Sequence, residues 1–569
     1  MLYENLLNNP PMIVASQSGE SVFNTIRRWS SLHPYWTLTF IVLAVLVPFL
    51  AKPFNVDDPL FIWTARQISA HPGDPYGFNV NWYWTPLPMW SVMENPPLVS
   101  YYLALAAGIF GWSEISLRFA CLLPAIAAIL GTHRLAKRFC DQPMLAALAT
   151  LFTPVFLLSS TTVMCDMPML AFWVWAMVFW VEGMEQNSFW KLSASGLLVA
   201  LAVLTKYYGV CLLPLLIVYA MLEKCRPGRW CLYLLIPMAA ICAYQWVTYD
   251  LYGHALFSKA IHYAGDTKNI LGVSKITAGL TTLTFTGGCV AVAFFFAPLF
   301  WRQAGLVLVA FGFFAIIGMF REYVLLQRGS WAAIEFQIIF WMTGGLFVIL
   351  LIVSDVLHNR NSRSWLLALW LLGTFSFTAF FNWTVNGRSL LPMAPVIGIL
   401  IARRLGRDVL TGRKISTRKV MICFTISALF ALLVTRADYL LAVAVRQSVR
   451  EVCAYHGSQP GKLWFQGHWG FQYYMQECGA LAMDIKHSAL KPGDFLALPA
   501  NNTNLLPPDS KTITLLKTFD IPGPGLLTTW NARTGAGFFF ASVQGPLPFA
   551  FGTIPPERVA VYGLKKTVP

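Results

Sequence analysis

Two adjacent acids, Asp57 and Asp58, follow the first long apolar run of the chain, Trp36–Ala51. A carboxylate can act as a general base toward an acceptor hydroxyl, and ionisable groups at the edge of hydrocarbon are energetically expensive. The pair is therefore a candidate reaction centre. The alternative is that the acids cap a helix beginning near Pro59, because Asp is favoured at N-caps and Pro at the first helical position. Local features alone do not separate these two interpretations.

The composition indicates a polytopic membrane protein. Of the 569 residues, 57% are hydrophobic and only 12% are charged, and the mean hydropathy is +0.58. A soluble domain would be about one quarter charged. The formal net charge of +15 comes from short clusters of Lys and Arg between apolar runs, which is typical of cytoplasmic loops. No nucleic-acid partner is needed to explain it.

One short apolar run, Pro96–Gly111, decides the topology. If it does not cross the membrane, the later basic loops, including the dense cluster in 403–419, fall on the same side as Arg27 and Arg28. If it crosses, nearly all of those charges move outside, against the positive-inside bias. We therefore predict a juxtamembrane helix on the outer face.

The remaining apolar runs are long enough to predict about thirteen membrane-spanning helices. They are Trp36–Ala51, Ser116–Leu135, Met144–Ser159, Met167–Glu182, Leu192–Leu204, Val210–Leu222, Trp230–Tyr249, Ile276–Phe300, Ala304–Phe320, Ala332–Val353, Trp365–Phe381, Leu390–Ala402 and Val420–Thr435. The predicted organisation is a cytoplasmic segment 1–34, a membrane domain 35–437 whose first outer loop 52–115 carries the acids, and a periplasmic domain 438–569. Gly, Pro and Asn separate short β-like runs in this last domain, which suggests a small α/β or α+β unit. The runs are Lys462–Gln466, Phe495–Leu498, Lys511–Leu516 and Gly537–Val543.

This topology gathers acids and bases from distant parts of the chain on the outer face. Asp57 and Asp58 are candidates for a general base, and Lys206 and Arg388 are candidates to hold an anionic leaving group such as a phosphate. Each residue has a structural alternative. The two cations could extend from helix ends to the interface, Asp166 could be an N-cap, and Glu94 with Arg118 could form a surface ion pair.

The order of the motifs resembles the polyprenyl-phosphate-dependent glycosyltransferases of the GT-C class. The resemblance covers about Trp36 to Arg404 and is to the bacterial branch that contains the protein O-mannosyltransferases and the aminoarabinose (lipid A) transferases. It rests on the acid pair, Pro96-Pro97, Gly111-x-Ser113-Glu114-x-x-x-Arg118, Asp166-x-Pro168, Leu204-Thr205-Lys206 and Gly387-Arg388-Ser389-Leu390-Leu391-Pro392.

The resemblance implies a role for each matching residue. Asp57 is the implied catalytic base, and Asp58 stands where the family usually carries Glu. Asp166 matches the outer-loop Asp, and Lys206 is implied to hold the lipid phosphate. The motif arginines are Arg118 and Arg388, which we place with the donor phosphate. Candidate substrate-binding residues are Glu94, Asn95, Tyr207, His254 and His262.

One departure concerns the acceptor. The aminoarabinose transferases place a Lys before the juxtamembrane Pro, and this chain has Asn95 there. Specificity for lipid A is therefore not indicated. We expect a bacterial inner-membrane enzyme that moves a sugar from an undecaprenyl-type phosphate carrier to a protein, lipid A, another glycan or a lipid on the periplasmic face.

Several points stay open at the level of sequence. A divalent cation could join Asp57, Asp58 and Asp166, since hard cations prefer oxygen ligands, but no spacing demands one. Cys453 and Cys478 lie in the outer segment and could form a disulfide. A transporter or flippase of lipid-linked sugars, and a membrane scaffold with a partner-binding outer domain, are the alternative functions.

Overall fold

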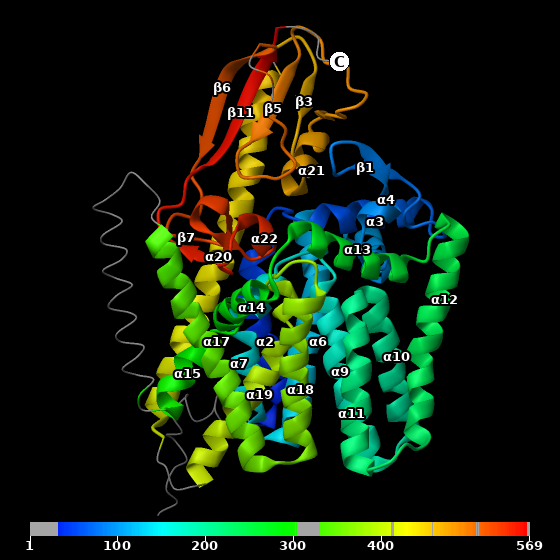
Figure 1. Cartoon of the computed structure of the whole chain (residues 1–569), viewed down its shortest axis with the longest axis vertical. Helices are drawn as coiled ribbons and strands as arrows, with labels where there is room; N and C mark the ends of the chain where they lie inside the picture. The colour runs from blue at the N-terminus through cyan, green and yellow to red at the C-terminus, as the bar shows by residue number, and fades with distance from the viewer. Residues whose placement is uncertain are drawn as a thin grey trace, which may run out of the picture.

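The computed structural model describes residues 32–301, 303, 331–410, 415–457, 459–507, 509 and 511–565. A bundle of helices carries a smaller domain with strands on one end (Figure 1). The predicted class, a polytopic helical membrane protein with a small C-terminal domain that contains strands, is confirmed. The helices of the bundle and its outer end are α2 (Pro34–Leu46), η1 (Val47–Phe49), α3 (Asp58–Ala70), α4 (Met89–Val92), α5 (Leu98–Phe110), α6 (Glu114–Phe139), α7 (Pro143–Leu151), α8 (Pro154–Ser160), α9 (Asp166–Gln186), α10 (Phe189–Thr205), η2 (Tyr207–Cys211), α11 (Leu212–Lys224), η3 (Arg229–Leu234), α12 (Leu235–Tyr252), α13 (Leu256–Leu271), α14 (Lys275–Cys289), α15 (Val292–Phe300), α17 (Trp331–Asn359), α18 (Ser362–Ser376), η4 (Phe377–Phe381), η5 (Arg388–Leu390), α19 (Met393–Leu410) and α20 (Thr417–His456).

The predicted spans correspond to these helices. Within the described ranges, seven helices are long and apolar enough to cross a membrane, or nine if two bent pairs each count as one span. The bent pairs are α7 with α8, at 65°, and α14 with α15, at 81°. The predicted spans Trp36–Ala51 and Leu192–Leu204 coincide with shorter apolar helices, and Leu390–Ala402 lies largely in α19. The predicted span Ala304–Phe320 lies outside the described residues.

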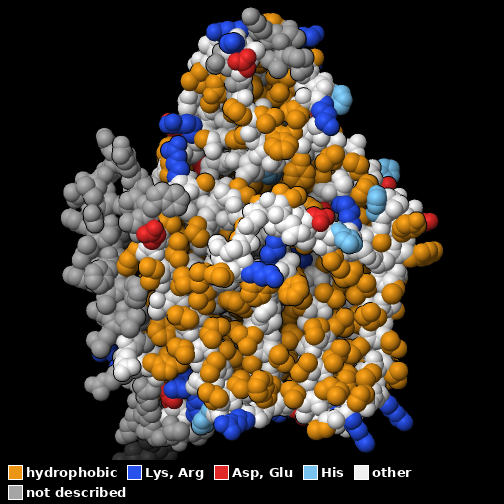
Figure 2. Space-filling model, in the orientation of Figure 1, with side chains coloured by type: hydrophobic (Ala, Val, Ile, Leu, Met, Phe, Trp, Pro, Cys, Tyr) orange, Lys and Arg blue, Asp and Glu red, His pale blue; other side chains and the backbone are white. Residues whose placement is uncertain are grey.

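The surface of the bundle is consistent with a position in the membrane. Figure 2 shows a broad hydrophobic band over the helices and Lys and Arg side chains along the rim farthest from the strand domain. Exposed basic residues in the turns between spans include Lys224, Arg226, Arg229 and Arg360. The basic rim and the strand domain therefore lie at opposite ends of the bundle.

Helices α3, α4 and α13 lie between the bundle and the strand domain (Figure 1). The predicted juxtamembrane run forms α5, which packs against α3 and α6. The hydroxyl of Tyr102 on α5 donates to the carbonyl of Ala120 at 2.7 Å, and that of Ser116 on α6 donates to the carbonyl of Phe110 at 2.6 Å. These bonds attach α5 to the outer end of α6. That α5 does not cross the membrane remains a prediction.

The strand domain is built on a five-stranded mixed sheet in the order β4-β3-β5-β11-β6. Its strands are β3 (Leu463–Phe465), β4 (Leu481–Ala482), β5 (Phe495–Pro499), β6 (Ile513–Ile521) and β11 (Glu557–Leu564). Strand β3 runs parallel to β4 and β5, whereas β11 is antiparallel to β5 and β6. The outer part of α20 and helix α21 (Trp469–Glu477) pack on this sheet through a core that includes Val452, Phe465, Phe471 and Val561.

Three of the predicted β-like runs overlap strands β3, β5 and β6, but the fourth, Gly537–Val543, was wrong. Its first residue ends the two-residue strand β9 (Ala536–Gly537), and the chain then forms the short helix α22 (Ala541–Gln544). This segment folds down onto the bundle instead of joining the sheet, because Phe538 accepts from the amide of Gly387 and Ala541 donates to the carbonyl of Val385. The same C-terminal segment contains the short strands β7 (Leu527–Thr528), β8 (Trp530–Asn531) and β10 (Ala550–Phe551) and the turn η6 (Ala532–Thr534). In the first outer loop, β1 (Asn79–Asn81) and β2 (Pro86–Pro88) form a hairpin.

The boundary expected at residue 438 falls inside α20, a continuous helix of 40 residues that rises from the bundle into the sheet domain. A disulfide between Cys453 and Cys478 joins the outer end of this helix to the residue after α21. Disulfides persist in oxidising compartments and are rare in the cytosol. The bond therefore suits a domain that lies in an oxidising compartment.

Replacing Cys478 with Ser should destabilise the outer domain. Closing a loop of this length stabilises a fold by about 3 kcal/mol, so we expect an earlier unfolding transition in a thermal melt of the purified protein. In non-reducing denaturant, a maleimide label should react with the exposed Cys225 but not with Cys453 or Cys478 of the wild type. Full labelling of both outer cysteines without a reductant would show that the bond does not form.

Candidate active site

Four charged side chains predicted from the sequence form a continuous chain on the outer side of the bundle. Arg388 Nη2 lies 2.9 Å from Asp57 Oδ2, and Arg388 Nη1 lies 3.8 Å from Asp166 Oδ2. Lys206 Nζ lies 2.5 Å from Asp166 Oδ1. Each residue is held at the end of a helix: Asp57 precedes α3, Asp166 begins α9, Lys206 follows α10 and Arg388 begins η5. The structure thus joins residues up to 331 positions apart.

The burial of this chain is uneven. The side chain of Asp166 is fully buried, whereas those of Asp57, Lys206 and Arg388 are 17%, 17% and 13% exposed. Buried charges are stable only when they are paired, and the two cations here balance the two carboxylates. Because Asp57 and Lys206 are partly open, each can meet a ligand without leaving its partner.

The guanidinium of Arg388 is oriented by its surroundings. Its Cζ lies 5.5 Å from the ring centre of Phe539, and its Nη1 lies 3.0 Å from the sulfur of Met164. Its Nε has no hydrogen-bond partner among the described residues. An unpaired buried donor of this kind is costly and calls for an explanation. A bound anion would supply the missing acceptor.

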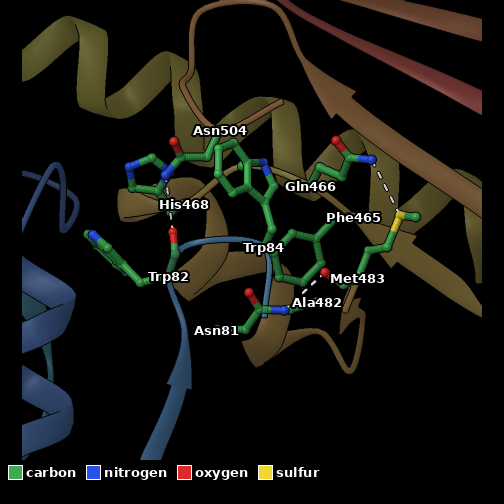
Figure 3. A pocket seen from close by; sticks show the side chains of 10 residues that line it. Asn81, Trp82, Trp84, Phe465, Gln466, His468, Ala482, Met483 and Asn504 are labelled. Atoms are coloured by element: carbon green, nitrogen blue, oxygen red, sulfur yellow. Dashed lines mark hydrogen bonds between the residues drawn. The ribbon is translucent and has the colours of Figure 1, made fainter. Parts of the chain in front are cut away.

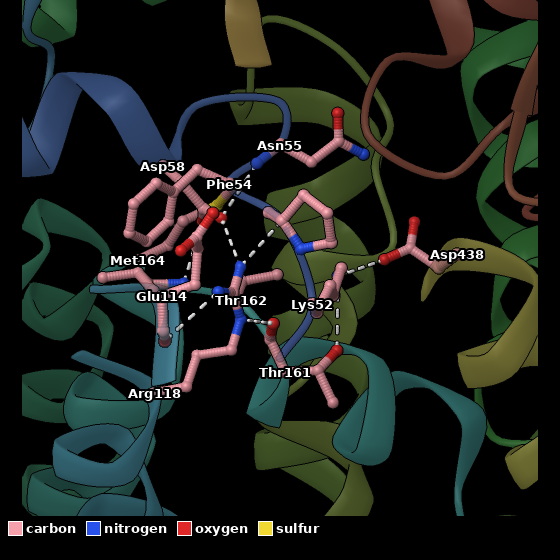
Figure 4. A network of polar contacts seen from close by, with 12 residues as sticks. Lys52, Phe54, Asn55, Asp58, Glu114, Arg118, Thr161, Thr162, Met164 and Asp438 are labelled. Carbon is pink, nitrogen blue, oxygen red and sulfur yellow. Dashed lines mark hydrogen bonds and ion pairs between the residues drawn. The ribbon is translucent and has the colours of Figure 1, made fainter. Parts of the chain in front are cut away.

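Asp58 has a different role from its neighbour. Its Oδ2 accepts from Arg118 Nη2 and from the amide of Asn55, both at 3.1 Å, and its Oδ1 accepts from the amide of Val163 at 2.8 Å (Figure 4). Burial raises the pKa of Asp58, against the opposing effect of the Arg118 guanidinium. Neither acid caps α3 as the alternative interpretation required, because the helix has no side-chain hydrogen bond at its N-cap. Asp58 instead ties the first outer loop to the segment before α9.

Arg118 is occupied by protein partners. It is almost fully buried, and besides Asp58 it donates from Nε to the carbonyl of Thr161 and from Nη2 to the carbonyl of Pro53, each at 3.0 Å. Its Nη1 reaches the carbonyl of Glu114 at 3.5 Å. A phosphate would have to displace one of these acceptors. This placement favours a structural role over the predicted contact with the donor phosphate.

A buried ion pair that was not predicted lies beside these contacts. Lys52 pairs with Asp438, and its Nζ also donates to Thr161 Oγ1 at 3.3 Å (Figure 4). The hydroxyl of Thr529 donates to Asp438 Oδ1 at 2.8 Å. Both charged side chains are at most 1% exposed. The pair joins the start of the first loop to α20 across 386 positions, and the only hint in the sequence is that each charge lies at the end of an apolar run.

Glu94 belongs to a second polar cluster that borders Asp57. Its partner is Lys259 on α13, at 3.3 Å, and not Arg118 as in the surface-pair alternative. Burial raises the pKa of Glu94. Tyr83 is hydrogen-bonded to Tyr263, and both hydroxyls interact electrostatically with Glu94 and Asp57. The two tyrosine hydroxyls therefore lie within electrostatic range of both the second cluster and the chain of charges.

The other candidate substrate-binding residues differ in their surroundings and in their exposure to solvent. His254 stacks on Trp90 with ring centres 4.6 Å apart, and the Tyr207 hydroxyl lies 3.1 Å from that of Tyr244. Asn95 contributes a backbone carbonyl, which accepts from the hydroxyl of Tyr76 at 2.7 Å. His262 is exposed on α13. The first two lie in aromatic walls near Glu94, whereas His262 faces solvent.

The sequence left open a divalent cation at Asp57, Asp58 and Asp166, but the described residues contain no ligand set for one. There, no three His, Cys, Asp or Glu side chains come together in a way that would hold a metal ion. Asp57, Asp58 and Asp166 pair with Arg388, Arg118 and Lys206 instead.

Residues 94–248 match the family model of the dolichyl-phosphate-mannose-protein mannosyltransferases. This match confirms the predicted resemblance to GT-C glycosyltransferases with lipid-linked donors, and with it the expectation of a sugar-transferring membrane enzyme. The matched segment contains Glu94, Arg118, Asp166 and Lys206. The chain matches no curated protein in sequence.

Several solved structures are similar in arrangement. One is ArnT from Cupriavidus metallidurans bound to undecaprenyl phosphate, with 12% identity, a TM-score of 0.46 and coverage of 84% of this chain and 94% of that one. Another is the oligosaccharyltransferase of Archaeoglobus fulgidus in complex with Zn and sulfate, with 12% identity, a TM-score of 0.47 and coverage of 82% and 67%. A third is the mycobacterial arabinofuranosyltransferase AftD, with 11% identity, a TM-score of 0.37 and coverage of 95% and 40%.

Replacing Arg118 with Ala should destabilise the protein because it leaves the buried Asp58 carboxylate unpaired. Breaking a buried ion pair in this way costs about 3–5 kcal/mol, which should appear as a lower unfolding temperature of the purified protein. Arg66→Ala on α3 is a matched control, because its ion pair with Glu477 is exposed and is worth at most about 1 kcal/mol. A normal melt for Arg118→Ala, together with a raised KM for the donor, would favour phosphate binding instead.

Proposed function

We propose that this GT-C glycosyltransferase moves one sugar from a polyprenyl-phosphate carrier to an acceptor on the periplasmic face of a bacterial inner membrane. The observation that carries the proposal is the chain formed by Asp57, Arg388, Asp166 and Lys206. It sets a candidate base beside two cations at the outer ends of helices. Transfer of a sugar from a lipid phosphate needs a base for the acceptor and cations for the leaving phosphate, both at the membrane surface.

In the proposed reaction, Asp57 accepts the proton of the acceptor's hydroxyl or amine as that atom attacks the anomeric carbon of the sugar. The bond between this carbon and the phosphate oxygen breaks, and the lipid phosphate leaves with the electron pair. Arg388 and Lys206 stabilise the negative charge that develops on the phosphate, since cations in a poorly hydrated site act strongly on it. Asp166 holds both cations in position and does not react.

The second cluster is suited to contact the sugar and the acceptor. Glu94 and Lys259 offer an acceptor and donors for sugar hydroxyls, and the hydroxyls of Tyr83 and Tyr263 interact electrostatically with both Glu94 and Asp57. Trp90, with His254 stacked on it, provides an aromatic face. We assign this wall to the transferred sugar because it combines polar groups with an aromatic face, and because its two tyrosine hydroxyls interact electrostatically with the proposed base.

Two features support the periplasmic orientation. The disulfide between Cys453 and Cys478 lies at the same end of the bundle as the charge chain, and such bonds belong to oxidising compartments. The exposed basic residues lie at the opposite rim, where the positive-inside bias places the cytoplasm.

A transporter or flippase of lipid-linked sugars is the second candidate. It is favoured by the bends of 65° and 81° within two apparent spans, because broken helices are typical of transporters. A transporter, however, would bind its substrate near the middle of the membrane, and the charge chain lies at the outer helix ends. Transfer of a labelled sugar from polyprenyl phosphate by the purified protein distinguishes the two.

Asp57→Asn should abolish most of the transfer activity while the protein still folds. General-base catalysis contributes about 10²–10⁴-fold to a rate, so we expect a loss in that range in a single-turnover assay with a radiolabelled lipid-linked sugar. Asp520→Asn is a matched control, because it makes the same chemical change at an exposed ion pair with Arg558 on the outer domain. If Asp57→Asn transfers sugar at the wild-type rate, Asp57 is not the base.

A further inference from the structure

Two hollows in the described part of the chain differ greatly in size. The one between the first outer loop and the sheet domain, lined by Asn81, Trp84 and His468 among others, has a volume of about 20 Å³ (Figure 3). It has room for about one water molecule. The other, which we call the rim hollow, is lined by residues of α17 and α19 and by Trp301 after α15, and has a volume of about 500 Å³. This is the size range of sites for small organic ligands.

The rim hollow lies at the end of the bundle that faces away from the sheet domain. Its lining residues on α17 extend to His358, two positions before the exposed Arg360, and those on α19 lie in the last two turns of the helix. Lys and Arg side chains mark this rim in Figure 2. The proposed orientation puts this end of the bundle at the cytoplasmic leaflet, whose anionic lipids attract basic residues.

Two arginines converge on a single neutral hydroxyl in the rim hollow. Arg404 Nη1 donates to Ser354 Oγ at 2.8 Å, and Arg407 Nη2 donates to the same atom at 3.3 Å. The two arginines are three positions apart and so share one face of α19. Among the described lining residues they meet one acid, Asp408, which leaves a net charge of +1. Two like charges held at one neutral oxygen repel each other, and an anion bound between them would offset this repulsion.

The guanidinium of Arg404 is held in place with one donor left for a ligand. Its Nε lies 3.4 Å from Asp408 Oδ1, and its Cζ lies 5.8 Å from the ring centre of Trp301, a distance at which an aromatic face attracts a cation. Within the described ranges, these contacts and the bond to Ser354 use Nε and Nη1 but not Nη2, and the side chain is 18% exposed. Nη2 can therefore bind a phosphate oxygen without breaking an existing contact.

An apolar stripe leads from the rim hollow toward the middle of the membrane. Leu350, Val353 and Leu357 line one side of the hollow, and Leu346 continues the same face of α17 one turn deeper. These four side chains are 44% to 62% exposed. Exposed apolar residues are expected on any membrane helix, but these lead directly to a pair of cations. A phosphate that carries acyl chains matches both parts of the site, whereas a free anion would contact only the cations.

We propose that the rim hollow binds the phosphate of an anionic glycerophospholipid from the cytoplasmic leaflet. The phosphate lies between Arg404 and Arg407, and an acyl chain lies along the apolar stripe of α17. This lipid takes no part in the proposed transfer, because its site and the chain of charges lie at opposite ends of the bundle. The lipid instead joins α17 to α19 at the rim.

The test is native mass spectrometry of the full-length protein, purified in detergent and titrated with phosphatidylglycerol, phosphatidylcholine or a polyprenyl phosphate. We expect the wild type to bind phosphatidylglycerol about tenfold more tightly than phosphatidylcholine. Arg404→Gln should lose this preference, because it removes the charge and the open donor. Arg229→Gln, the same change at an exposed arginine of the same rim outside the hollow, should bind like the wild type.

A second variant tests the site without breaking an ion pair. Leu357 is 62% exposed, so Leu357→Glu should fold and melt normally while its carboxylate repels a phosphate in the hollow. We expect this variant to lose the preference for phosphatidylglycerol. Leu222→Glu is the matched control, because it makes the same change at a residue that is 43% exposed near the end of α11 and outside the hollow.

Four outcomes would overturn the proposal. They are equal binding of the two phospholipids by the wild type, a preference for phosphatidylglycerol that both Arg404→Gln and Leu357→Glu keep, binding of the polyprenyl phosphate that Arg404→Gln abolishes, and displacement of phosphatidylglycerol by millimolar inorganic phosphate. Asp57→Asn should bind the lipids like the wild type, because Asp57 does not line the hollow. A failure of the transfer assay with normal lipid binding would therefore refute the proposed function and leave the lipid site in place.

Discussion

Ionised side chains at the outer edge of the bundle must be paired, and this constraint holds the distant parts of the chain together. Asp58 pairs with Arg118, Lys52 with Asp438, and Asp57 and Asp166 share Arg388. Each pair joins a different set of helices. Because an unpaired charge in such a place is strongly destabilising, the loop carrying the acids can adopt few other arrangements.

The same constraint gives the two neighbouring acids, Asp57 and Asp58, different roles. Asp58 is 1% exposed and turns inward to Arg118, whereas Asp57 is 17% exposed and faces Arg388. A fixed loop is what lets a partly open carboxylate keep its position relative to the cations. The Lys52–Asp438 pair extends this rigidity to α20, and so to the sheet domain into which α20 rises.

Much of this arrangement follows from the sequence, because apolar runs have a required length and basic loops have a preferred side. These rules located the spans, and together with the ordered motifs they brought Asp57, Asp166, Lys206 and Arg388 to one face. The partners of individual charges were not predictable. Arg118 and Lys52 each had several acids at plausible positions, and the choice depends on how helices 60 to 386 residues apart pack. The run Gly537–Val543 has β-like composition, but backbone bonds to the loop at Gly387 decide its conformation.

The central claim is that Lys206 and Arg388 hold the phosphate of a lipid-linked donor beside Asp57. The most direct measurement is a cryo-EM structure of the purified protein with a bound polyprenyl phosphate. The account predicts phosphate density within hydrogen-bond distance of Lys206 Nζ and the Arg388 guanidinium, at the outer ends of α10 and η5. Phosphate density at the basic rim on the opposite side of the bundle, with the outer charge chain unliganded, would contradict it.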